Sequence, residues 1–306
     1  MNKKNSTNFT IENMGRDWLF FTQNSVKISS AQTYKYLFEK HIENSDLSTI
    51  AIGLLTSEDV AAFSRGLVRE GLSPKTVNSI LLTVNAIFKY AKNLYGITPP
   101  YIKYVRDERR ETRVLTVAEQ NRLESYLRAD LGGFNMGVLF ALYTGVRIGE
   151  LCALKWSDIA DGAVSINKTM YRLRSGDGKT AVMIDKPKTE SSNRTIPLPD
   201  FLTKLVESRR RGDEDFFLSN DQISKVEPRL LQSKFKKITS ACALEGVTFH
   251  TLRHTFATRC IECGFDAKTL SEILGHSDVK TTLNLYVHCS LELKRNSMNL
   301  LEKLAV

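Results

Sequence analysis

The segment ITPPYIKYVRDERRETR (97–113) constrains the fold more than any other stretch of the chain. Its adjacent prolines cannot continue a helix, and its charged run has no apolar periodicity, so it predicts a linker. Only helical patterns precede it, whereas the residues that follow include segments typical of short strands. A chain of 306 residues is also long for a single core. We therefore expect two domains, over residues 1–96 and 114–306.

The segment before the linker predicts a small helical domain. Thr56 followed by Asp59 forms a near capping box, and Gly71 ends the helix that they begin. The next helix has Ser73 as its N-cap, a proline at its first position and Gly96 as its stop. With an amphipathic start and a second helix capped by a serine, these signals predict four helices, over residues 10–23, 30–42, 56–71 and 73–96.

The segment after the linker predicts helices around a small sheet. A helix restarts over residues 115–127, with Thr116 as its cap and Glu119 completing a capping box. The mostly apolar segment 133–145 predicts a buried helix, and helices return from Asp200 onward. Between them, alternation and turn residues predict strands over residues 163–173, 180–188 and 193–198. The expected fold class is α+β: mainly α, with one small antiparallel β-sheet.

Composition indicates a protein of the reducing cytoplasm. No apolar run approaches the roughly 18 residues of a membrane span, and the N-terminus lacks the apolar region of a secretory signal. Five cysteines are an odd number, which argues against a disulfide framework. Cys260 and Cys263 form a lone CxxC with no second pair nearby, so we expect no zinc site.

The net charge favours a polyanionic partner. The chain carries 43 basic and 34 acidic residues, a formal net charge of +9. Residues 1–105 contribute +4 (12 basic, 8 acidic), and the remainder contributes +5 (31 basic, 26 acidic). A basic balance along the whole chain fits contact with nucleic acid, although many soluble proteins are equally basic.

Several familiar catalytic motifs are incomplete. SGDGKT (175–180) lacks the glycine that a Walker A loop would need at Leu173, so it predicts a hairpin turn. HTLRH (250–254) lacks the glutamate of a zincin helix. No cluster of carboxylates indicates a two-metal nuclease. Any phosphoryl transfer would therefore rely on other side chains.

Two arginines are candidates for holding a phosphate. His250, Arg253 and His254 are spaced i, i+3 and i+4, so they share one helix face, where a guanidinium can donate two parallel hydrogen bonds. Arg147 stands at the start of another helix, with Glu150 three residues on. Taken alone, the first pattern also fits a surface arginine beside a core histidine. The second also fits a surface arginine, Arg147, paired with Glu150.

A lysine is a candidate for protonating a leaving oxygen. Lys188 follows a predicted strand in DKPKTESSNRTIPL (185–198) and opens a turn. A lysine can donate a proton when burial or neighbouring cations lower its pKa. Lys179 and Lys186 lie nearby, so spacing alone does not choose among the three.

Near the C-terminus, GHSDVKTTLNLYVH (275–288) carries the candidate nucleophile Tyr286 between His276 and His288. By composition it is an ordinary amphipathic segment whose tyrosine could simply pack. A phenol with a pKa near 10 is mostly protonated at neutral pH, so a nucleophilic tyrosine needs cations and a base nearby.

Taken in order, TGVRIGEL, KTESSNRTIPL, HTLRH, LGH and TLNLYVH resemble the motifs of the tyrosine recombinase (phage-type integrase) family. The resemblance implies a catalytic set of six residues: Arg147, Lys188, His250, Arg253, His276 and the nucleophile Tyr286. It also implies a SAM-like core-binding domain over residues 1–96, a linker over 97–113, and a catalytic domain with an oligomerisation tail over 114–306. A separate arm-binding domain is not expected, because the helical pattern begins close to Met1.

The family mechanism assigns each residue a role at a DNA phosphate. Tyr286 would attack the phosphorus, expel the 5′-hydroxyl and form a 3′-phosphotyrosyl link. Arg147 and Arg253 would hold the non-bridging oxygens, and His276 would hydrogen-bond the phosphate. His250 would exchange a proton with the nucleophile. No cofactor is implied, because the covalent link conserves the phosphodiester energy.

The remaining assignments concern proton transfer and support. Lys188 would protonate the leaving oxygen, and no metal is then required. His254 and Glu150 are interpreted as structural, and His288 as incidental.

The implied partners are double-stranded DNA, clamped by the two domains, and further copies of the chain in a homo-tetramer on synapsed DNA. The leucines of SLELKRNSMNLLEKLAV (290–306) either pack on their own domain or dock on a neighbouring protomer. A directionality factor is a further candidate partner, no membrane is expected, and the location would be the nucleoid in the cytoplasm.

The expected function is site-specific recombination that integrates or excises a mobile element or phage. The alternatives are a Xer-like chromosome dimer resolvase, a type IB topoisomerase, and a DNA-binding protein that keeps the fold without cutting.

Overall fold

The computed structural model describes residues 9–107, 113–174, 180–187, 190–219 and 223–286, together with residues 295, 298 and 299. Within these ranges the side chains of Arg174, Glu190 and residues 284–286 are not described. The chain divides into two compact units, Met1–Arg110 and Glu111–Val306. Each unit has a hydrophobic core of its own.

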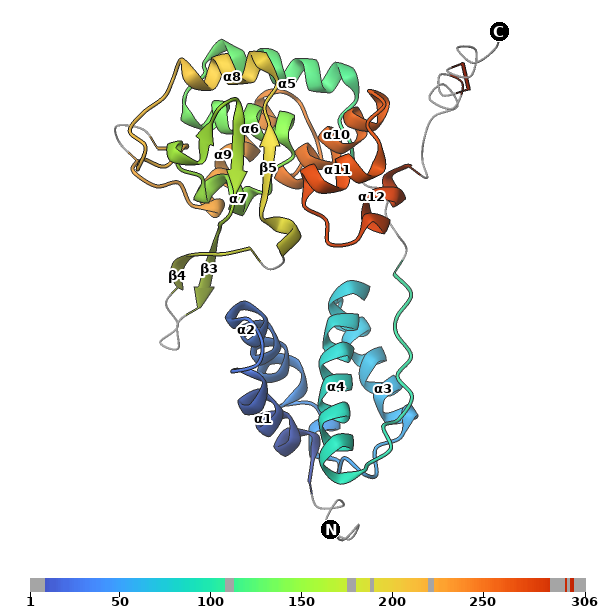
Figure 1. Ribbon diagram of the computed structural model, residues 1–306. Helices are drawn as coiled ribbons and strands as arrows, with labels where there is room; N and C mark the ends of the chain where they lie inside the picture. Colours follow the sequence, from blue (N-terminus) through green and yellow to red (C-terminus); the bar gives the residue numbers. More distant parts are fainter. Residues whose placement is uncertain are drawn as a thin grey trace. The chain divides into compact units, whose positions relative to one another are not determined.

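The N-terminal unit is helical and is organised around its longest helix. Its helices are α1 (Ile11–Thr22), α2 (Ile28–Leu37), α3 (Ser57–Arg69) and α4 (Pro74–Tyr95), with a π-turn η2 (Phe38–Ile42) and a 3-10 turn η3 (Asp46–Thr49). α4 packs against α1, α2 and α3 (Figure 1). The packed faces form an apolar core that includes the fully buried Phe38, Ile80 and Phe88.

The helix boundaries of this unit follow their capping residues in most cases. Thr56 and Asp59 exchange capping bonds at the start of α3, and Ser73 caps α4, as the sequence predicts. Gly96 ends α4 in the left-handed conformation. The serine cap predicted for the second helix is wrong: α2 begins at Ile28 without a side-chain cap.

The C-terminal unit contains the remaining helices. They are α5 (Val117–Ala129), α6 (Gly133–Thr144), α7 (Ile148–Ala153), α8 (Asp200–Glu207), α9 (Pro228–Ala241), α10 (Phe249–Glu262), α11 (Ala267–Leu274) and α12 (Val279–Tyr286), with 3-10 turns η4 (Trp156–Asp158) and η5 (Glu190–Ser192). The prediction of a buried apolar helix is confirmed by α6, which packs against α5, α7, α9 and α10.

The strands of this unit form two antiparallel sheets, and the expectation of a single sheet is wrong. β1 (Ile159–Ala160), β2 (Ala163–Ile166) and β5 (Arg194–Pro197) form one sheet in the order β1-β2-β5. β3 (Thr169–Arg174) and β4 (Thr180–Asp185) form a separate hairpin (Figure 1). The predicted strand 163–173 breaks after Ile166, so that its first half pairs with β5 and its second half with β4.

Within the described part of the chain, no helix combines the length and apolar character needed to cross a lipid bilayer. The predicted oligomerisation tail, residues 290–306, lies outside the described residues except at positions 295, 298 and 299. His288 also lies outside them.

Candidate active site

Arg147 stands in the turn that joins α6 to α7. After α6, Gly145 adopts a left-handed backbone (φ 63°), and its N–H donates to the oxygen of Ala141. A Cβ at Gly145 would lie 2.5 Å from Phe256 and 3.0 Å from Leu274, so only glycine allows this close approach to α10 and α11. The turn thereby brings Arg147 to the C-terminal end of α11.

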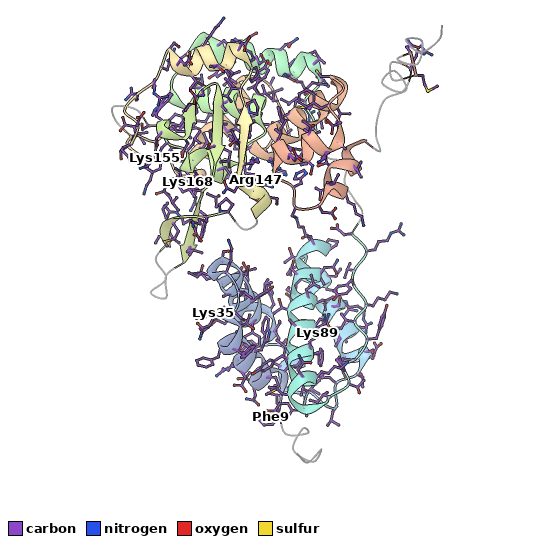
Figure 2. All side chains as sticks on the ribbon, in the orientation of Figure 1. Phe9, Lys35, Lys89, Arg147, Lys155 and Lys168 are labelled. Carbon is purple, nitrogen blue, oxygen red and sulfur yellow. The ribbon has the colours of Figure 1, made fainter. Side chains whose placement is uncertain are left out.

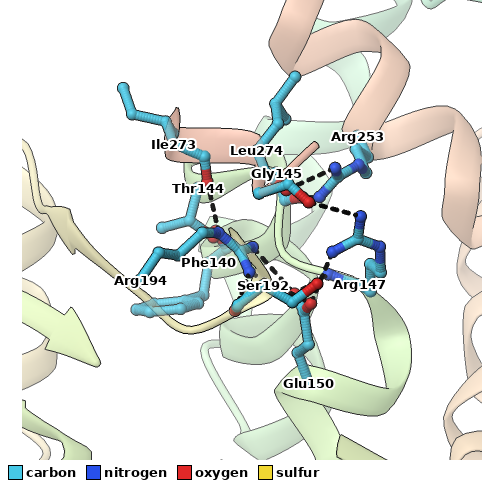
Figure 3. A network of polar contacts seen from close by, with 11 residues as sticks. Phe140, Thr144, Gly145, Arg147, Glu150, Ser192, Arg194, Arg253, Ile273 and Leu274 are labelled. Carbon is cyan, nitrogen blue, oxygen red and sulfur yellow. Dashed lines mark hydrogen bonds and ion pairs between the residues drawn. The ribbon is translucent and has the colours of Figure 1, made fainter. Parts of the chain in front are cut away.

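Glu150 is the buried centre of an ion-pair network (Figure 3). Its side chain is 3% exposed and accepts hydrogen bonds from the backbone N–H of Arg147 at 2.9 Å and from its Nη1 at 2.8 Å. Arg194 of β5 binds both carboxylate oxygens, through Nη1 at 3.2 Å and Nη2 at 2.9 Å. Desolvation raises the pKa of Glu150, but the bonds from Arg194 and Arg147 outweigh it and lower the pKa below its usual value. The carboxylate is therefore ionised and shared by two arginines.

Three successive carbonyls at the end of α11 each accept a hydrogen bond from a different arginine (Figure 3). The pairs are Arg194 Nε with Ile273 O (2.6 Å), Arg253 Nη2 with Leu274 O (2.6 Å) and Arg147 Nη2 with Gly275 O (3.2 Å). The last carbonyls of a helix lack intrahelical partners and carry the negative end of the helix dipole, so they attract cations. The end of α11 thus fixes the orientation of all three guanidinium groups.

α10 supplies Arg253 and, one turn earlier, His250. Arg253 is buried, and its Nη1 donates to Gly145 O at 2.8 Å. Burial, followed by the charge of Arg147, lowers the pKa of Arg253 to about 9, so the guanidinium stays charged at neutral pH. His250 is exposed at the surface, and desolvation, Arg253 and Arg147 lower its pKa. A neutral His250 next to these cations is suited to accept a proton.

His276 follows the turn at the end of α11, and a buried threonine holds its ring. Its Nδ1 lies 2.8 Å from Oγ1 of Thr282, which is fully buried in α12. Desolvation, then Arg253 and Arg147, lower the pKa of His276 to about 4, so the ring is neutral at pH 7. No hydrogen bond to its Nε2 is seen within the described residues.

His254 packs against His250. The two rings meet edge to face, with centroids 4.5 Å apart. Desolvation, followed by His250 and Arg253, lowers the pKa of His254 to about 4. This packing fits the supporting role that the sequence suggests.

Arg147 and His276 line a surface pocket of about 360 Å³. Its other lining residues are Glu150, Thr169, Pro187, Ser192, Gly275, Ser277 and Thr281. Arg147 is the exposed cation of the network, at 38% side-chain exposure, and it lies at the edge of the C-terminal unit in Figure 2. The pocket therefore offers a phosphate one accessible guanidinium and one neutral imidazole.

The structure brings four of the six predicted site residues together: Arg147, His250, Arg253 and His276. Tyr286 is the last residue of α12, and its side chain is not described. Lys188 lies outside the described residues, next to the pocket-lining Pro187 in the chain. The catalytic roles of all six stay predictions.

Sequence reasoning missed two residues of the network, Arg194 and Thr282. A signal existed for Arg194, because it precedes the buried Ile196 by two positions in β5 and so shares its inward face. An arginine on the inward face of a strand requires a buried partner, which is Glu150. Thr282 carried no such signal. Across the described residues, no group of three His, Cys, Asp or Glu side chains could hold a metal ion.

The sequence of this chain is similar to a known protein family and to several known proteins. The family described as the phage integrase family matches residues 110–292, more than half of the chain. A "tyrosine recombinase XerC-like" protein of Caldanaerobacter subterraneus is 27% identical, over 97% of this chain and 84% of its own length. The ICEBs1 integrase of Bacillus subtilis is 28% identical, over 84% of this chain and 73% of its own length.

Two solved structures have a similar fold. The Tn1549 transposon integrase in complex with a circular intermediate DNA superposes with a TM-score of 0.81 at 23% identity, over 96% of this chain and 99% of that one. A lambda integrase tetramer bound to a Holliday junction gives a TM-score of 0.68 at 19% identity, over 90% and 80%. At these identities the likeness concerns the fold.

Proposed function

The chain belongs to the phage integrase family, and we propose that this site-specific recombinase cleaves and rejoins DNA through a covalent bond to Tyr286. The observation that carries the proposal is the arginine cluster at the end of α11. It presents Arg147 beside the neutral His276, and the neutral His250 stands one helical turn before Arg253. A phosphodiester anion and a phenol need such a cation and such bases.

The proposed cleavage is a transesterification in which no bond energy is lost. The Tyr286 oxygen attacks the phosphorus while its proton passes to His250. The bond from phosphorus to the 5′-oxygen breaks, and Lys188 gives that oxygen a proton. The products are a 3′-phosphotyrosyl link and a free 5′-hydroxyl. Attack on this link by the 5′-hydroxyl of another duplex reverses the steps and exchanges the strands.

The position of Tyr286 in α12 supports its assignment. α12 packs against α10 and α11, the helices that carry or cap the arginines. Thr282 in the same helix bonds His276. Position 286 follows Thr282 by four residues in this helix, so its backbone lies on the same helix face.

DNA is the proposed substrate and main partner. The N-terminal unit carries exposed lysines on α2 and α4, among them Lys75. Lys35 and Lys89 are two further examples (Figure 2). Such groups are suited to contact phosphates, and the affinity that they provide should fall as the salt concentration rises. We further propose that four copies assemble on two duplexes, as in the lambda integrase tetramer on a Holliday junction, and that a directionality factor biases the reaction.

Covalent capture tests the proposal even when the DNA site of the protein has not been identified. Random-sequence duplexes that carry nicks are incubated with the protein, and adducts resistant to SDS are isolated and sequenced. The wild type should capture a defined set of sequences, and Tyr286→Phe should capture none. Adducts formed equally by Tyr286→Phe would contradict the assignment of the nucleophile. The captured sequences would also separate integration of a mobile element from Xer-like resolution, which use different sites.

The lysine assignment has a matched control. Lys186 and Lys188 flank the pocket-lining Pro187, so their variants probe the same segment. Lys188→Ala should slow cleavage, and a substrate whose leaving oxygen is replaced by sulfur should restore it, because a thiolate needs no proton to leave. Lys186→Ala should leave cleavage near the wild-type rate. The reverse pattern would move the acid to Lys186.

A further inference from the structure

Arg194 belongs to the arginine cluster, but it cannot bind a phosphate in the way that Arg147 can. Its side chain is 6% exposed, whereas that of Arg147 is 38% exposed. Its Nε donates to Ile273 O, both terminal nitrogens bind Glu150, and Nη1 also donates to Ser192 O at 3.1 Å. A guanidinium with these acceptors has little donor capacity left for a phosphate. Arg194 therefore acts on other residues.

The charges of the network show what Arg194 contributes. Glu150 binds Nη1 of Arg147, and this bond alone would cancel much of the positive charge that a phosphate needs. The cations Arg147, Arg194 and Arg253 and the single anion Glu150 give the network a net charge of +2. Without Arg194 the net charge would be +1. The second arginine thus offsets the buried carboxylate.

Arg194 also holds the turn that leads to His276. A Cβ at Gly275 would lie 3.0 Å from Cδ of Arg194 and 3.1 Å from its Nη1, so this side chain packs directly under the turn. Its bond to Ile273 O fixes the first of the three carbonyls, and Gly275 O, the third, accepts from Arg147. One buried side chain therefore touches both the counter-ion and the carbonyl array of Arg147.

We propose that Arg194 is a positioning residue that neutralises Glu150 and braces the end of α11, so that Arg147 meets the scissile phosphate as an oriented, uncancelled cation. This inference rests on the proposed function. Arg194 does not touch the phosphate in this proposal, and it affects cleavage only through Glu150 and Arg147. The buried Glu150 orients Arg147, and Arg194 prevents the same carboxylate from quenching the charge of Arg147.

Variants of Arg194 and Glu150 separate the electrostatic role from folding. Arg194→Met should lower the rate of adduct formation at saturating DNA by about 100-fold, because Arg147 would be misplaced and partly neutralised. The DNA concentration for half-saturation should change by less than threefold. Adding Glu150→Gln to Arg194→Met restores the charge to +2, and the double variant should react at least tenfold faster than Arg194→Met. Arg194→Lys, which keeps the charge but not the fork, should be intermediate.

A neutral substrate gives a readout that a purely structural role would not move. When a methylphosphonate replaces the scissile phosphate, the reacting group loses one negative charge, and the Arg147 cation matters less. The ratio of wild-type to Arg194→Met rates should then shrink to a few-fold. Arg259→Met is the matched control, because Arg259 also bonds a backbone oxygen, that of Leu115, but makes no described bond to Glu150. Its rate per folded molecule should stay near that of the wild type on both substrates.

The outcomes are distinct. Equal rate ratios for Arg194→Met on both substrates, or a double variant no faster than Arg194→Met, would overturn the positioning role while leaving the proposed function intact. A wild type that forms no adduct with any DNA would overturn both. Should Arg194→Met fail to fold, the same comparison of substrates with Arg194→Lys decides the question.

Discussion

The two units of the chain differ in the polar side chains that they bury. In the described N-terminal unit, the buried polar side chains are hydroxyls: Thr22, Ser48, Ser64 and Thr83. In the C-terminal unit, Glu150 and Arg253 are buried as well, and the side chain of Arg194 is almost fully covered. Burying charge is unfavourable unless partners are supplied, so the second unit sacrifices stability for a polar network that the first unit does without.

This difference indicates that the C-terminal unit carries the catalytic chemistry. A helical unit with an apolar core and exposed lysines can bind a polyanion with its surface alone. A unit that keeps three arginines in contact with the carbonyls at the end of a helix holds an oriented cation, which is the requirement for stabilising charge in a transition state.

The largest expected effect is the loss of the buried carboxylate. Glu150→Gln leaves the buried Arg194 without its counter-ion, and the unfolding free energy of the C-terminal unit should fall by about 3–5 kcal/mol. In the N-terminal unit, Glu58→Gln removes an exposed partner of Arg65 and should cost less than about 1 kcal/mol. Denaturant unfolding checks both values.

The two tryptophans allow the units to be followed separately. Trp18 lies in the core of the N-terminal unit and Trp156 in that of the C-terminal unit, and the chain has no others. Replacing one of them by Phe leaves a fluorescence signal from the other unit. Glu150→Gln should shift only the Trp156 transition. Equal shifts of both transitions would mean that the units do not unfold independently.

Acidification should destabilise the C-terminal unit more than the N-terminal one. Desolvation and neighbouring cations lower the pKa values of His254 and His276 to about 4, below the unfolded value of about 6.5. Between these values the unfolded chain binds more protons than the folded one. The stability that the neutral rings contribute is therefore present above pH 6.5 and is lost as the pH falls toward 4. The N-terminal unit contributes one such group, His41, whose pKa desolvation and Lys40 lower.

Unfolding curves from pH 7.5 to pH 5 test this expectation. The Trp156 transition should move to lower denaturant concentration more steeply than the Trp18 transition. His254→Asn should flatten the Trp156 dependence. The same pH slope for both transitions would remove the link between the histidines and the buried network.

Local signals predicted the helices well because capping is a local interaction. Thr56, Ser73 and Thr116 cap α3, α4 and α5 as their neighbours in sequence suggest. The sheets were predicted less well, because pairing partners are distant in sequence and alternation does not specify them. The pairing of Arg194 with Glu150 spans 44 positions, and it was missed for the same reason. The motif order pointed to Arg147 and Arg253, whereas the carbonyls that orient them depend on the packing of α11.

A smaller effect is expected at the turn after α11. Gly275 has φ 65°, and an added Cβ would lie 2.9 Å from Ser191 O and 3.0 Å from Arg194 Cδ. Gly264 also has a positive φ, of 85°, but a Cβ there would meet nothing within 4 Å. Gly264→Ala should cost about 1 kcal/mol from backbone strain alone, and Gly275→Ala about 1–3 kcal/mol more, since well-packed neighbours must move. Trp156 fluorescence measures both. Equal losses would mean that the carbonyl array tolerates displacement.

The smallest expected effect is one that should be the same in both units. Thr56 and Thr116 cap α3 and α5 with the same geometry: each Oγ1 accepts from the N–H three residues on, Asp59 or Glu119, at 3.2 Å. Replacing either threonine by alanine should cost about 1 kcal/mol in its own unit. Glu119 differs from Asp59 in one respect, because it also binds Arg113, which helps to lower its pKa to about 2. If Thr116→Ala costs above about 2 kcal/mol while Thr56→Ala costs about 1, the cap and this ion pair are coupled. Equal losses would mean that helix capping contributes equally in both units, so that the two units differ in their buried charge and not in their helix caps.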